Sequence, residues 1–457
     1  MGEPGYPLAG TTVLVCGAGL AGGAAVRALL RRDAAVLLAD RADTPAVRTL
    51  VDLGARFVSS PDVLPAGIEL VVTSPGWRPD HPLLRDALAR GVEVIGEVEF
   101  AWRLRGPGAA PWLAVTGTNG KTTTARMLES ILRASGARAL AVGNVGVSII
   151  DAVTADEPYD VLSVELSSFQ LHWSSAIAPA AGALLNLAPD HLDWHGSMAD
   201  YTAAKTRVWA GRLAIGNADD PNVATLLASV ETPTRVGFTL LPPARGQLGV
   251  LDGMLVDSAF DGSLRLVPVS DIRPPGAHNV ANALAAAALA RAHGVSAESV
   301  AEGLRTFVPD PHRNQQVGLR DGVLFVDDSK ATNPHAALAS LTAYDRVVWI
   351  AGGQLKDVPV DNLVAAVASR LAGVVLLGED RPIVAEALRR HAPDVRVIEI
   401  ASNDDGAMTE VVRAAAGLAR PGDTVLLAPA AASYDMFTGY AARGDAFAAA
   451  VADLDSA

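Results

Sequence analysis

Leu113-Ala-Val-Thr-Gly-Thr-Asn-Gly-Lys-Thr-Thr-Thr124 is the stretch from which the fold of this chain is best predicted. An apolar run over residues 112–115 predicts a strand before it, and apolar residues at a helical period over 125–132 predict a helix after it. A strand, a glycine-rich turn, Lys-Thr and a helix form the layout that cradles nucleotide phosphates. The stretch therefore predicts a phosphate-binding loop.

Each residue type in this turn suits a nucleotide. Gly117 and Gly120 allow backbone N–H groups to approach an anion closely, and the start of the helix adds positive potential. Lys121 can reach terminal phosphates, and the Thr122 hydroxyl can ligate Mg²⁺. The loop is shortened, because Val115 stands where the full pattern has its first glycine. Phosphate binding is favoured over a plain strand-to-helix turn.

The composition limits the class of protein. A chain of 457 residues predicts two to four domains, and 50% apolar with only 5% aromatic residues favours α/β layers. The formal net charge is −13. Because Lys and Arg do not cluster, nucleic acid and membrane surfaces are poor partners, whereas ATP in a local pocket is not excluded.

The cysteine content and the N-terminus indicate the compartment. Cys16 is the only cysteine, which excludes disulfides within the chain and Cys₄ zinc sites. The N-terminus lacks a basic segment followed by an apolar core, and no uninterrupted apolar run reaches about 18 residues. We expect a soluble, cytoplasmic protein.

The first part of the chain carries a dinucleotide-type pattern. A strand at 12–16 leads into Gly17-Ala-Gly-Leu-Ala-Gly22 and a helix to Arg32, and a second strand at 35–39 ends in Asp40. Such a pattern suits a nucleotide diphosphate at the helix start and a ribose hydroxyl at the acidic residue. The alternative is a βαβ unit whose glycines only allow close packing.

A second turn in this part lies at the same kind of sheet edge. A strand at 69–73 ends in Ser74-Pro-Gly76, at the edge where doubly wound sheets bind ligands. A strand at 92–95 and a helix at 96–102 follow, and residues 105–111 predict a linker. The chain thus has two separate nucleotide-type turns, the Gly-x-Gly-x-x-Gly turn at 17–22 and the Gly-Lys-Thr turn at 120–122. Together they indicate an enzyme that binds a nucleotide-tagged substrate and also consumes ATP.

The central region alternates strands and helices, as a mostly parallel sheet requires. A strand at 139–142 ends at a loop that contains Asn144. Glu165 follows a strand at 160–164, where it can hold Mg²⁺ or be a solvated charge at a strand end.

A histidine follows the next predicted strand, at 183–187. His191 adjoins Asp190, so it can ligate a second cation or accept a proton. Residues 231–272 predict irregular strands to which no chemistry can be assigned.

Two further polar features lie on predicted helices. Ser197 begins a helix that carries Lys205, which taken by itself reads as an exposed cation. An ammonium group cannot ligate Mg²⁺; only a carbamylated lysine could. Asn279 and Asn282 are three residues apart near a helix start, so they can bind an adenine edge or cap the helix.

The last part of the chain places polar turns after three predicted strands, at 323–326, 346–350 and 424–427. In a parallel sheet these turns gather at one edge. The turns are 327–334, 352–356 and 429–437, and their side chains Thr332, Lys356 and Ser433 suit a small ligand with carboxylates. Arg313, at the junction with the central region, can reach across to a phosphate.

Several motifs now point to one family. They are Gly117-Thr-Asn-Gly-Lys-Thr122, Glu165-Leu-Ser-Ser-Phe-Gln170, Asn186-Leu-x-x-Asp-His191-Leu-Asp193, Ala204-Lys205, His278-Asn279-x-x-Asn282 and His312-Arg313. Together they resemble the Mur ligases of peptidoglycan synthesis. Asp328-Ser-Lys-Ala-Thr-Asn333 and Ser433-x-Asp435-x-Phe437 resemble the branch of that family that adds D-glutamate to UDP-N-acetylmuramoyl-L-alanine. The likeness covers essentially the whole chain.

The resemblance implies an α/β fold with three domains. A Rossmann-like domain at 1–108 would bind the UDP substrate. A P-loop ATPase domain at 109–309, with a mostly parallel sheet, would bind ATP. A second Rossmann-like domain at 310–457 would bind D-glutamate.

The resemblance also implies the site residues. The UDP substrate would be held by Gly19, Leu20, Ala21, Asp40, Arg41, Ser74, Pro75, Gly76 and Asn144. ATP would be held by Gly117, Thr118, Asn119, Gly120, Lys121, Thr122, Thr123, Asn279, Asn282, Arg313 and Asp328. D-glutamate would be held by Lys330, Thr332, Lys356, Ser433 and the Phe437–Tyr440 segment. Thr122 and Glu165 would hold one Mg²⁺, and His191 with carbamylated Lys205 a second. The catalytic residues would be Lys121, His191, Lys205 and Arg313.

Two positions depart from the family pattern. Ala21 stands where a hydroxyl residue often follows the leucine, and Tyr440 stands where a phenylalanine is expected near the D-glutamate pocket.

The implied reaction is ATP-driven amide-bond formation through an acyl phosphate, in cytoplasmic synthesis of a cell-wall precursor. Two Mg²⁺ ions and Lys121 would reduce the repulsion between a carboxylate and a polyphosphate. Closure of the C-terminal domain is expected to bring Arg313 to the acyl phosphate and to exclude water. We expect a monomer, and the base that deprotonates D-glutamate stays unassigned.

Four alternatives make different predictions. A sister Mur ligase would add another amino acid, and a folylpolyglutamate synthetase would lack the dinucleotide-like N-terminal unit. An NAD-dependent oxidoreductase would explain only residues 17–22. A non-catalytic switch protein would hydrolyse ATP without requiring an amino acid.

Overall fold

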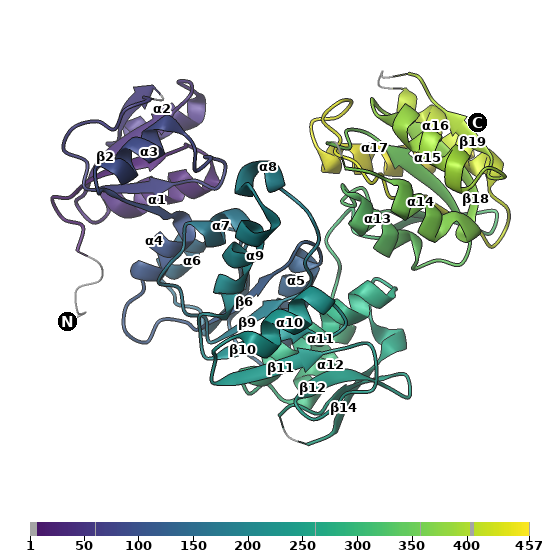
Figure 1. The fold of residues 1–457 in the computed structure, drawn as a ribbon, viewed down its shortest axis with the longest axis horizontal. Helices are drawn as coiled ribbons and strands as arrows, with labels where there is room; N and C mark the ends of the chain where they lie inside the picture. Colours follow the sequence, from purple (N-terminus) through teal and green to yellow (C-terminus); the bar gives the residue numbers. More distant parts are fainter. Residues whose placement is uncertain (1–6, 60, 261, 357, 403–405, 457) are drawn as a thin grey trace. The chain divides into compact units, whose positions relative to one another are not determined.

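The computed structural model describes residues 7–59, 61–260, 262–356, 358–402 and 406–456 (Figure 1). Their strands form three sheets, of five, nine and six strands. The chain divides into two compact units. The first unit comprises Met1–Asp271 with Ala281–Phe307, and the second comprises Ile272–Val280 with Val308–Ala457. The domain boundaries at 108/109 and 309/310 stay predictions.

The five-stranded sheet of the first unit is wholly parallel, with the order β3-β2-β1-β4-β5. Its strands are β1 (Thr12–Cys16), β2 (Ala35–Asp40), β3 (Arg56–Ser59), β4 (Leu70–Thr73) and β5 (Glu93–Gly96). Its helices are α1 (Leu20–Leu30), α2 (Pro45–Asp52), α3 (Pro82–Ala89) and α4 (Glu97–Arg103). The strand order reverses between β1 and β4, so the two predicted substrate turns adjoin at a topological switch point.

The nine-stranded sheet has the order β14-β13-β12-β11-β10-β9-β6-β8-β7 and is parallel from β7 to β12. Its strands are β6 (Trp112–Thr116), β7 (Ala139–Gly143), β8 (Val161–Glu165), β9 (Ala181–Leu184), β10 (Leu213–Asn217), β11 (Thr234–Phe238), β12 (Gln247–Leu251), β13 (Met254–Asp257) and β14 (Leu264–Pro268). The mostly parallel sheet is confirmed, and β11 to β14 confirm the strands predicted over 231–272.

The helices of this region follow the expected alternation. They are α5 (Lys121–Ala134), α6 (Ile149–Val153), α7 (Ser168–His172), α8 (Leu192–His195), α9 (Met198–Thr206), α10 (Pro221–Ser229), α11 (Ala277–Ala292) and α12 (Ala297–Arg305), with 3₁₀ turns at Arg207–Trp209 and Val269–Asp271. Capping explains several starts, because Ser197 and Asp220 each accept a backbone N–H of the first turn.

One predicted strand is displaced. Residues 183–187 were expected to form a strand, whereas β9 spans Ala181–Leu184. Its partner β6 ends at Thr116, where the glycine-rich loop begins. Residues after Leu184 therefore contact the loop: Asn186 accepts a hydrogen bond from the Thr118 amide through its backbone oxygen (3.1 Å).

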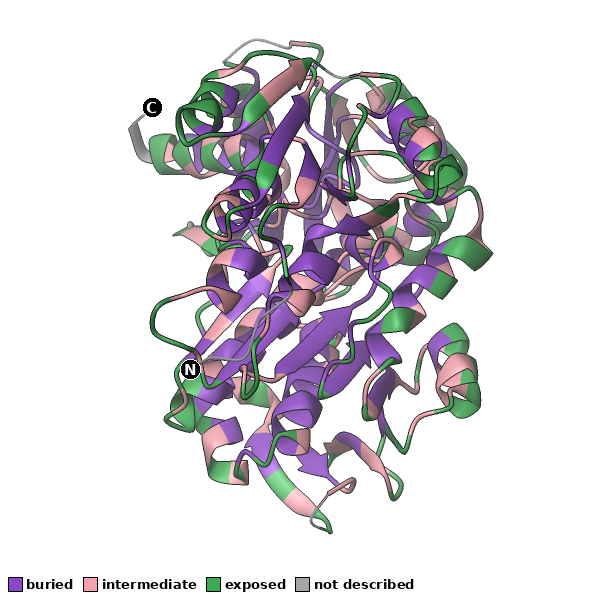
Figure 2. Cartoon of the chain, turned by 90° about the vertical axis from the view of Figure 1, so that its left-hand side faces the viewer, coloured by how far each residue is buried: buried purple, intermediate pink, exposed green. Residues whose placement is uncertain are grey.

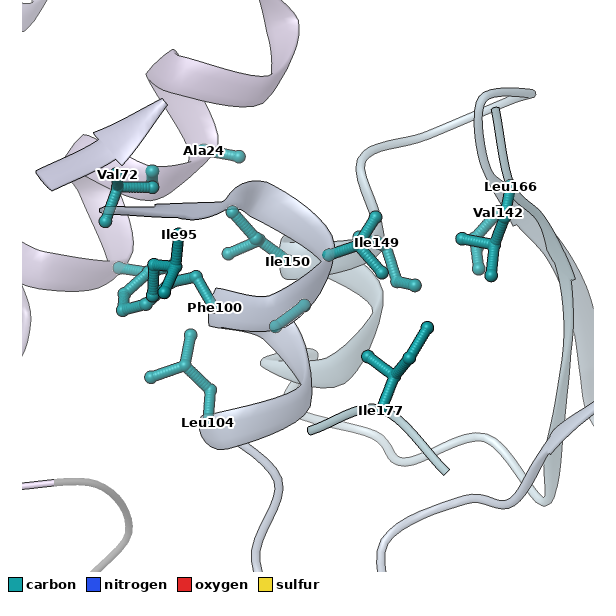
Figure 3. Packing of buried hydrophobic residues seen from close by; sticks show 14 of the residues in the cluster. Ala24, Val72, Ile95, Phe100, Leu104, Val142, Ile149, Ile150, Leu166 and Ile177 are labelled. Carbon is teal, nitrogen blue, oxygen red and sulfur yellow. The ribbon is translucent and has the colours of Figure 1, made fainter. Parts of the chain in front are cut away.

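The two sheets of the first unit share one hydrophobic core. Figure 3 shows side chains from both regions, among them Val72 and Phe100 on one side and Ile149 and Ile150 on the other. All are buried. Because α4 contributes Phe100 to this core, the five-stranded sheet is packed directly on the region that carries the phosphate loop.

The second unit contains the six-stranded sheet, with the order β15-β16-β20-β17-β18-β19. Its strands are β15 (Gln315–Arg320), β16 (Val323–Asp327), β17 (Val347–Gly352), β18 (Leu371–Leu377), β19 (Val397–Glu399) and β20 (Thr424–Leu427). Its helices are α13 (Pro334–Leu341), α14 (Asp361–Val367), α15 (Arg381–His391), α16 (Ala407–Leu418) and α17 (Tyr440–Ala452), with 3₁₀ turns at Ala368–Arg370 and Asp453–Ser456. All strands except β15 run parallel.

The three polar turns of the second unit meet as predicted. Strands β16, β20 and β17 are adjacent and parallel, so the turns at their carboxyl ends lie at one edge. The strands are mostly buried, whereas helices alternate buried and exposed residues (Figure 2). Among the described residues, no helix combines the length and apolar character needed to cross a membrane.

Candidate functional site

The predicted phosphate loop joins β6 to α5. Gly120 is the residue before the helix and has φ +84°, a left-handed conformation that glycine adopts without steric cost. A Cβ atom at this position would overlap the side-chain oxygen of Asn282. The strand, turn and helix are confirmed, and Asn282 lies against the loop.

Hydrogen bonds hold the loop in place. The Thr118 hydroxyl lies 2.9 Å from the Tyr201 hydroxyl, and the Asn119 amide donates to the side-chain oxygen of Asn186 at 2.8 Å. Asn186 returns a bond from Nδ2 to the Asn119 carbonyl at 3.1 Å. These bonds fix backbone N–H groups before any ligand binds, which reduces the ordering cost of binding.

Two lysines donate to carbonyl groups of this loop. Lys121 Nζ donates to Gly117 O at 2.9 Å and to Thr118 O at 2.7 Å. Lys205 Nζ also donates to Gly117 O, at 2.7 Å. The ammonium of Lys121 thus lies where the terminal phosphates of a nucleotide would lie.

The reading of Lys205 as an exposed cation is wrong. Its residue exposure is 2%, because Tyr201, Ala204 and Lys205 form the buried side of α9. Burial, followed by repulsion from Lys121, lowers the pKa of Lys205 well below its usual range. The environment therefore favours an uncharged amine.

Glu165 is likewise not a solvated charge. It is 1% exposed at the end of β8, and its Oε1 accepts a hydrogen bond from Asn144 Nδ2 at 2.9 Å. Its Oε2 is buried and has no hydrogen-bond partner among the described residues. An orphaned carboxylate oxygen beside a phosphate loop fits a hard cation such as Mg²⁺.

His191 occupies an exposed position at the start of α8. Its backbone is left-handed, with φ +53°, and its side chain is 46% exposed. The ring nitrogen Nε2 lies 3.5 Å from Asp190 Oδ2. The ring also packs on Phe169, with 4.8 Å between centroids.

Among the described residues, no cluster of three or more His, Cys, Asp or Glu side chains could hold a metal. The predicted ligand sets, Thr122 with Glu165 and His191 with modified Lys205, stay predictions. Mg²⁺ usually completes its coordination with water and substrate phosphates.

The predicted substrate turn follows β1. Asp40 does not point its carboxylate freely to solvent: Oδ2 accepts from the Ala18 amide at 2.7 Å and Oδ1 from the Arg41 amide at 2.6 Å. A Cβ atom at Gly22 would overlap the Gly17 carbonyl, so this glycine serves close packing. Gly19, by contrast, precedes α1 without a side-chain cap, which leaves the helix start open to an anion.

A cavity of about 230 Å³ joins this turn to the central region. Its lining residues are Leu20, Ala21, Pro75, Glu97, Gly143, Asn144, Val145, Gly146, Ser148 and Gln170. Four residues predicted to bind the UDP substrate, Leu20, Ala21, Pro75 and Asn144, thus line one cavity. The roles of all predicted site residues in binding stay predictions.

Glu97 is a cavity residue that sequence reasoning missed. It is 6% exposed, and its Oε1 accepts a hydrogen bond from Gln170 Nε2 at 2.6 Å. Burial raises the pKa of Glu97 to about 7, although the bond from Gln170 acts in the opposite direction. Glu97 belongs to no motif, so the sequence gives no local signal for it.

The second unit brings part of the predicted ATP set together. Asp328 Oδ1 accepts from the Asn314 amide at 3.1 Å, and Arg313 lies near enough to lower the pKa of Asp328. Burial is the larger effect and raises that pKa to about 6. Asn279, which is 3% exposed, donates to Pro275 O at 3.3 Å within the same unit.

The predicted D-glutamate residues lie on the polar edge of the second unit. Lys330 Nζ lies 3.9 Å from the centre of the Tyr440 ring, a cation–π contact. Ser433 is 2% exposed, and its carbonyl accepts the Phe437 amide at 2.8 Å. Lys356 is exposed, and the Thr332 amide donates to Lys330 O at 2.8 Å.

Arg443 was also missed, and it connects two of these turns. It is 1% exposed; Nε donates to the Ser329 hydroxyl at 3.0 Å and a terminal nitrogen to Ala431 O at 3.1 Å. The other terminal nitrogen donates to Ser329 O at 2.9 Å. An arginine in the alanine-rich α17 was the available signal.

Three family profiles match the chain. A Mur ligase MurD-like N-terminal domain matches residues 11–96, a Mur ligase middle domain matches 115–290, and a Mur ligase glutamate ligase domain matches 312–431. The first two matched ranges contain the substrate turn and the phosphate loop, and the third contains the polar turns at 327–334 and 352–356 and the start of the turn at 429–437.

Curated proteins with nearly the same length are similar to the chain. A protein from Thermobifida fusca is 57% identical, with 98% of this chain and 99% of that protein covered. A protein from Streptomyces coelicolor is 53% identical, with 97% and 98% covered, and one from Mycobacterium avium is 51% identical, with 97% and 96% covered. All three are named UDP-N-acetylmuramoylalanine–D-glutamate ligase.

Solved structures share the fold. UDP-N-acetylmuramate-alanine ligase from Thermotoga maritima has a TM-score of 0.58 at 20% identity, with 98% of this chain and 99% of that chain covered. MurF from Acinetobacter baumannii has a TM-score of 0.59 at 18% identity, with 91% and 89% covered. At these identities the solved structures show a shared α/β fold and no more.

Proposed function

The chain belongs to the Mur ligase family, and on that premise we propose that it is the ATP-dependent ligase that joins D-glutamate to UDP-N-acetylmuramoyl-L-alanine. The observation that carries the proposal is the braced phosphate loop, with Lys121 and Lys205 on its carbonyls, in the same unit as the substrate cavity. We place the reaction in the cytoplasm, where ATP and nucleotide sugars are available.

The proposed reaction has two steps. The carboxylate of the substrate's L-alanine attacks the γ-phosphorus of ATP, which gives an acyl phosphate and ADP. The amine of D-glutamate, after loss of a proton, attacks the acyl carbon, and phosphate leaves from the tetrahedral intermediate. The first step brings an anion to a polyanion, so positive charge near the γ-phosphate is the main requirement.

The loop residues supply part of that charge. Lys121 is bound to two loop carbonyls, and its ammonium can exchange them for the β- and γ-phosphates of ATP. Backbone N–H groups between Gly117 and Thr123, other than those of Thr118 and Asn119, which donate to Asn186, would donate to the remaining phosphate oxygens. In the second unit, Arg313, Asp328 and Asn279 would contact ATP.

Mg²⁺, when bound, would neutralise phosphate charge and orient the γ-phosphoryl group. Thr122 and Glu165 would hold one ion, which the orphaned Oε2 of Glu165 supports. His191 and Lys205 would hold a second. The exposure of His191 and its place next to Asp190 are consistent with a cation there.

Lys205 could ligate a cation only after modification. Addition of CO₂ to its amine, with loss of one proton, gives a carbamate whose single negative charge is shared by two oxygens. The burial of Lys205 supports this, because an uncharged amine is the form that reacts with CO₂ and a buried ammonium is disfavoured.

D-glutamate would be held by Lys330, Thr332, Lys356, Ser433 and Tyr440. The convergence of their turns at the carboxyl ends of three adjacent parallel strands supports a common site. Two lysines suit a ligand with two carboxylates.

An isotope experiment tests the acyl phosphate. UDP-N-acetylmuramoyl-L-alanine labelled with ¹⁸O in the alanine carboxylate should transfer one labelled oxygen to the phosphate released with D-glutamate. Unlabelled phosphate, formed at the same rate as product, would contradict the proposed first step.

A substitution tests the carbamate. Lys205→Ala should lose activity, and added short carboxylic acids should restore part of it by replacing the carbamate oxygens. Acids added to Lys121→Ala should restore nothing, which is the matched control. Near-normal activity of Lys205→Ala without any response to acids would reject the carbamate.

A further inference from the structure

The cavity between the substrate turn and the central region contains one buried carboxyl group. Glu97 lines this cavity and is 6% exposed. Its Oε2 is buried and has no hydrogen-bond partner among the described residues. An orphaned carboxyl oxygen of this kind costs free energy unless a ligand satisfies it.

Hydrogen bonds fix which atom of Glu97 is available. The Ser167 amide donates to Gln170 Oε1 at 2.9 Å, so the amide nitrogen of Gln170 points to Glu97. That nitrogen donates to Glu97 Oε1 at 2.6 Å. Oε1 is therefore an acceptor already in use, and a proton on Glu97 must reside on Oε2.

The surroundings of Glu97 supply no strong charge of their own. Charged or titratable groups on α4 and on the elements packed against it are Arg27 of α1, Asp151 of α6, His172 of α7, Glu93 of β5, and Glu99 and Arg103 of α4. Arg27 pairs with Asp151 at 3.1 Å, and Arg103 pairs with both glutamates. Burial is the largest influence on the pKa of Glu97, which is about 7.

An anion in the same cavity would raise this pKa further. The first turn of α1, with Leu20 and Ala21 at the cavity wall, offers unpaired helix N–H groups to a diphosphate. An ionised carboxylate would repel that diphosphate, whereas a neutral carboxylic acid can donate to it. The bound state therefore favours the protonated acid.

We propose that Glu97 is a substrate-binding residue that acts as a carboxylic acid, donating a hydrogen bond from Oε2 to an anionic oxygen of the nucleotide-sugar diphosphate. The inference rests on the proposed function only for the identity of the substrate. Gln170 and Ser167 orient the acid, and binding adds a proton to Glu97 at neutral pH.

Equilibrium binding of UDP-N-acetylmuramoyl-L-alanine, measured by calorimetry without ATP or D-glutamate, tests this proposal. The diphosphate and the carboxylate of the ligand are fully ionised throughout the range from pH 6.5 to 8.5. With a pKa of about 7 for the free protein, the Kd of the unaltered protein should rise roughly 25-fold over this range. The sign follows from linkage: the binding-competent acid is present below pH 7 and is lost above it.

Two variants of Glu97 separate a donor from an acceptor. Glu97→Gln replaces the O–H by an N–H donor in the same place. Its affinity should therefore be the same at every pH, and equal to the affinity that the unaltered protein has at pH 6.5. Glu97→Ala should bind more weakly and without pH dependence. Uridine, which lacks the diphosphate, should bind all three proteins without pH dependence.

Three results would overturn the inference. A Kd of the unaltered protein that is constant from pH 6.5 to 8.5 would do so without any variant. Glu97→Gln binding as weakly as Glu97→Ala would make Glu97 an ionised acceptor, and a pH dependence retained in Glu97→Gln would assign it to another group. Absence of binding by the unaltered protein at pH 6.5 would instead refute the substrate of the proposed function.

Discussion

Substitution of Gly120 by alanine probes the phosphate loop most sharply, because the same helix offers a matched control. Gly120 precedes α5 with φ +84°, and Gly136 follows the helix with φ +89°. A Cβ atom at Gly120 would overlap Asn282 Oδ1, whereas a Cβ atom at Gly136 has no atom within 4 Å. An alanine at either position therefore adopts an unfavourable left-handed backbone, but only the alanine at position 120 overlaps a neighbouring side chain.

The expected magnitudes follow from these geometries. Left-handed backbone costs an L-residue about 1–2 kcal/mol, which is the expected loss of unfolding free energy for Gly136→Ala. Gly120→Ala must also displace the Asn282 side chain, at a further cost of about 0.5–1.5 kcal/mol. The variant Asn282→Ala should cancel this second part in a double-mutant cycle with Gly120→Ala.

The loop change should also weaken ATP binding. If one backbone N–H moves off a phosphate oxygen, the loss is about 1.5–3 kcal/mol, or roughly 10- to 150-fold in Kd. Calorimetry with Mg²⁺-ATP and denaturant unfolding measure the two effects on each variant. Gly136→Ala should bind ATP normally. Equal ATP affinities for Gly120→Ala and Gly136→Ala would show that the conformation of Gly120 does not position an N–H group for phosphate.

Three further predictions concern other contacts. Tyr201→Phe removes the hydroxyl that lies 2.9 Å from the Thr118 hydroxyl. This change should lower the affinity for ATP about 2- to 10-fold. An unchanged affinity would show that the contact does not stabilise the loop. Arg443→Met removes two hydrogen bonds to Ser329 and one to Ala431, so it should raise the KM for D-glutamate more than that for ATP. An equal rise in both KM values would argue for general destabilisation. Burial lowers the pKa of His195 to about 4 in the folded protein. As the pH drops from about 6.5 towards 4, this histidine is protonated in the unfolded chain but not in the folded protein, so the free energy of unfolding falls. Denaturant unfolding of His195→Gln should show a smaller fall over that range, and an identical fall would assign it to other groups.

Much of the fold follows from local sequence patterns. The loop between β6 and α5, the substrate turn after β1 and the three polar turns of the second unit each lie where periodicity and glycine placement predict them. In each case a buried strand run ends in residues that cannot continue it. The end of β9 was misplaced, because it depends on where its neighbour β6 ends.

The burial of charged side chains was less predictable, because it depends on distant partners. Lys205 is buried by contact with Gly117, 88 residues away, although its spacing from Tyr201 on α9 hinted at a shared face. Glu97 owes its environment to Gln170, 73 residues away, and Arg443 to Ser329, 114 residues away. Such partners become visible only when the sheets and helices are assembled.

The proposed reaction couples the cleavage of ATP beside Lys121 to the addition of D-glutamate. The most direct test measures phosphate release from ATP in the presence of UDP-N-acetylmuramoyl-L-alanine and, in turn, D-glutamate, L-glutamate, L-lysine or diaminopimelate. Of the four amino acids, only D-glutamate should support the release of phosphate. The variant Lys121→Ala should release no phosphate with D-glutamate. Release with L-lysine or diaminopimelate but not D-glutamate, or full activity of Lys121→Ala, would contradict the account.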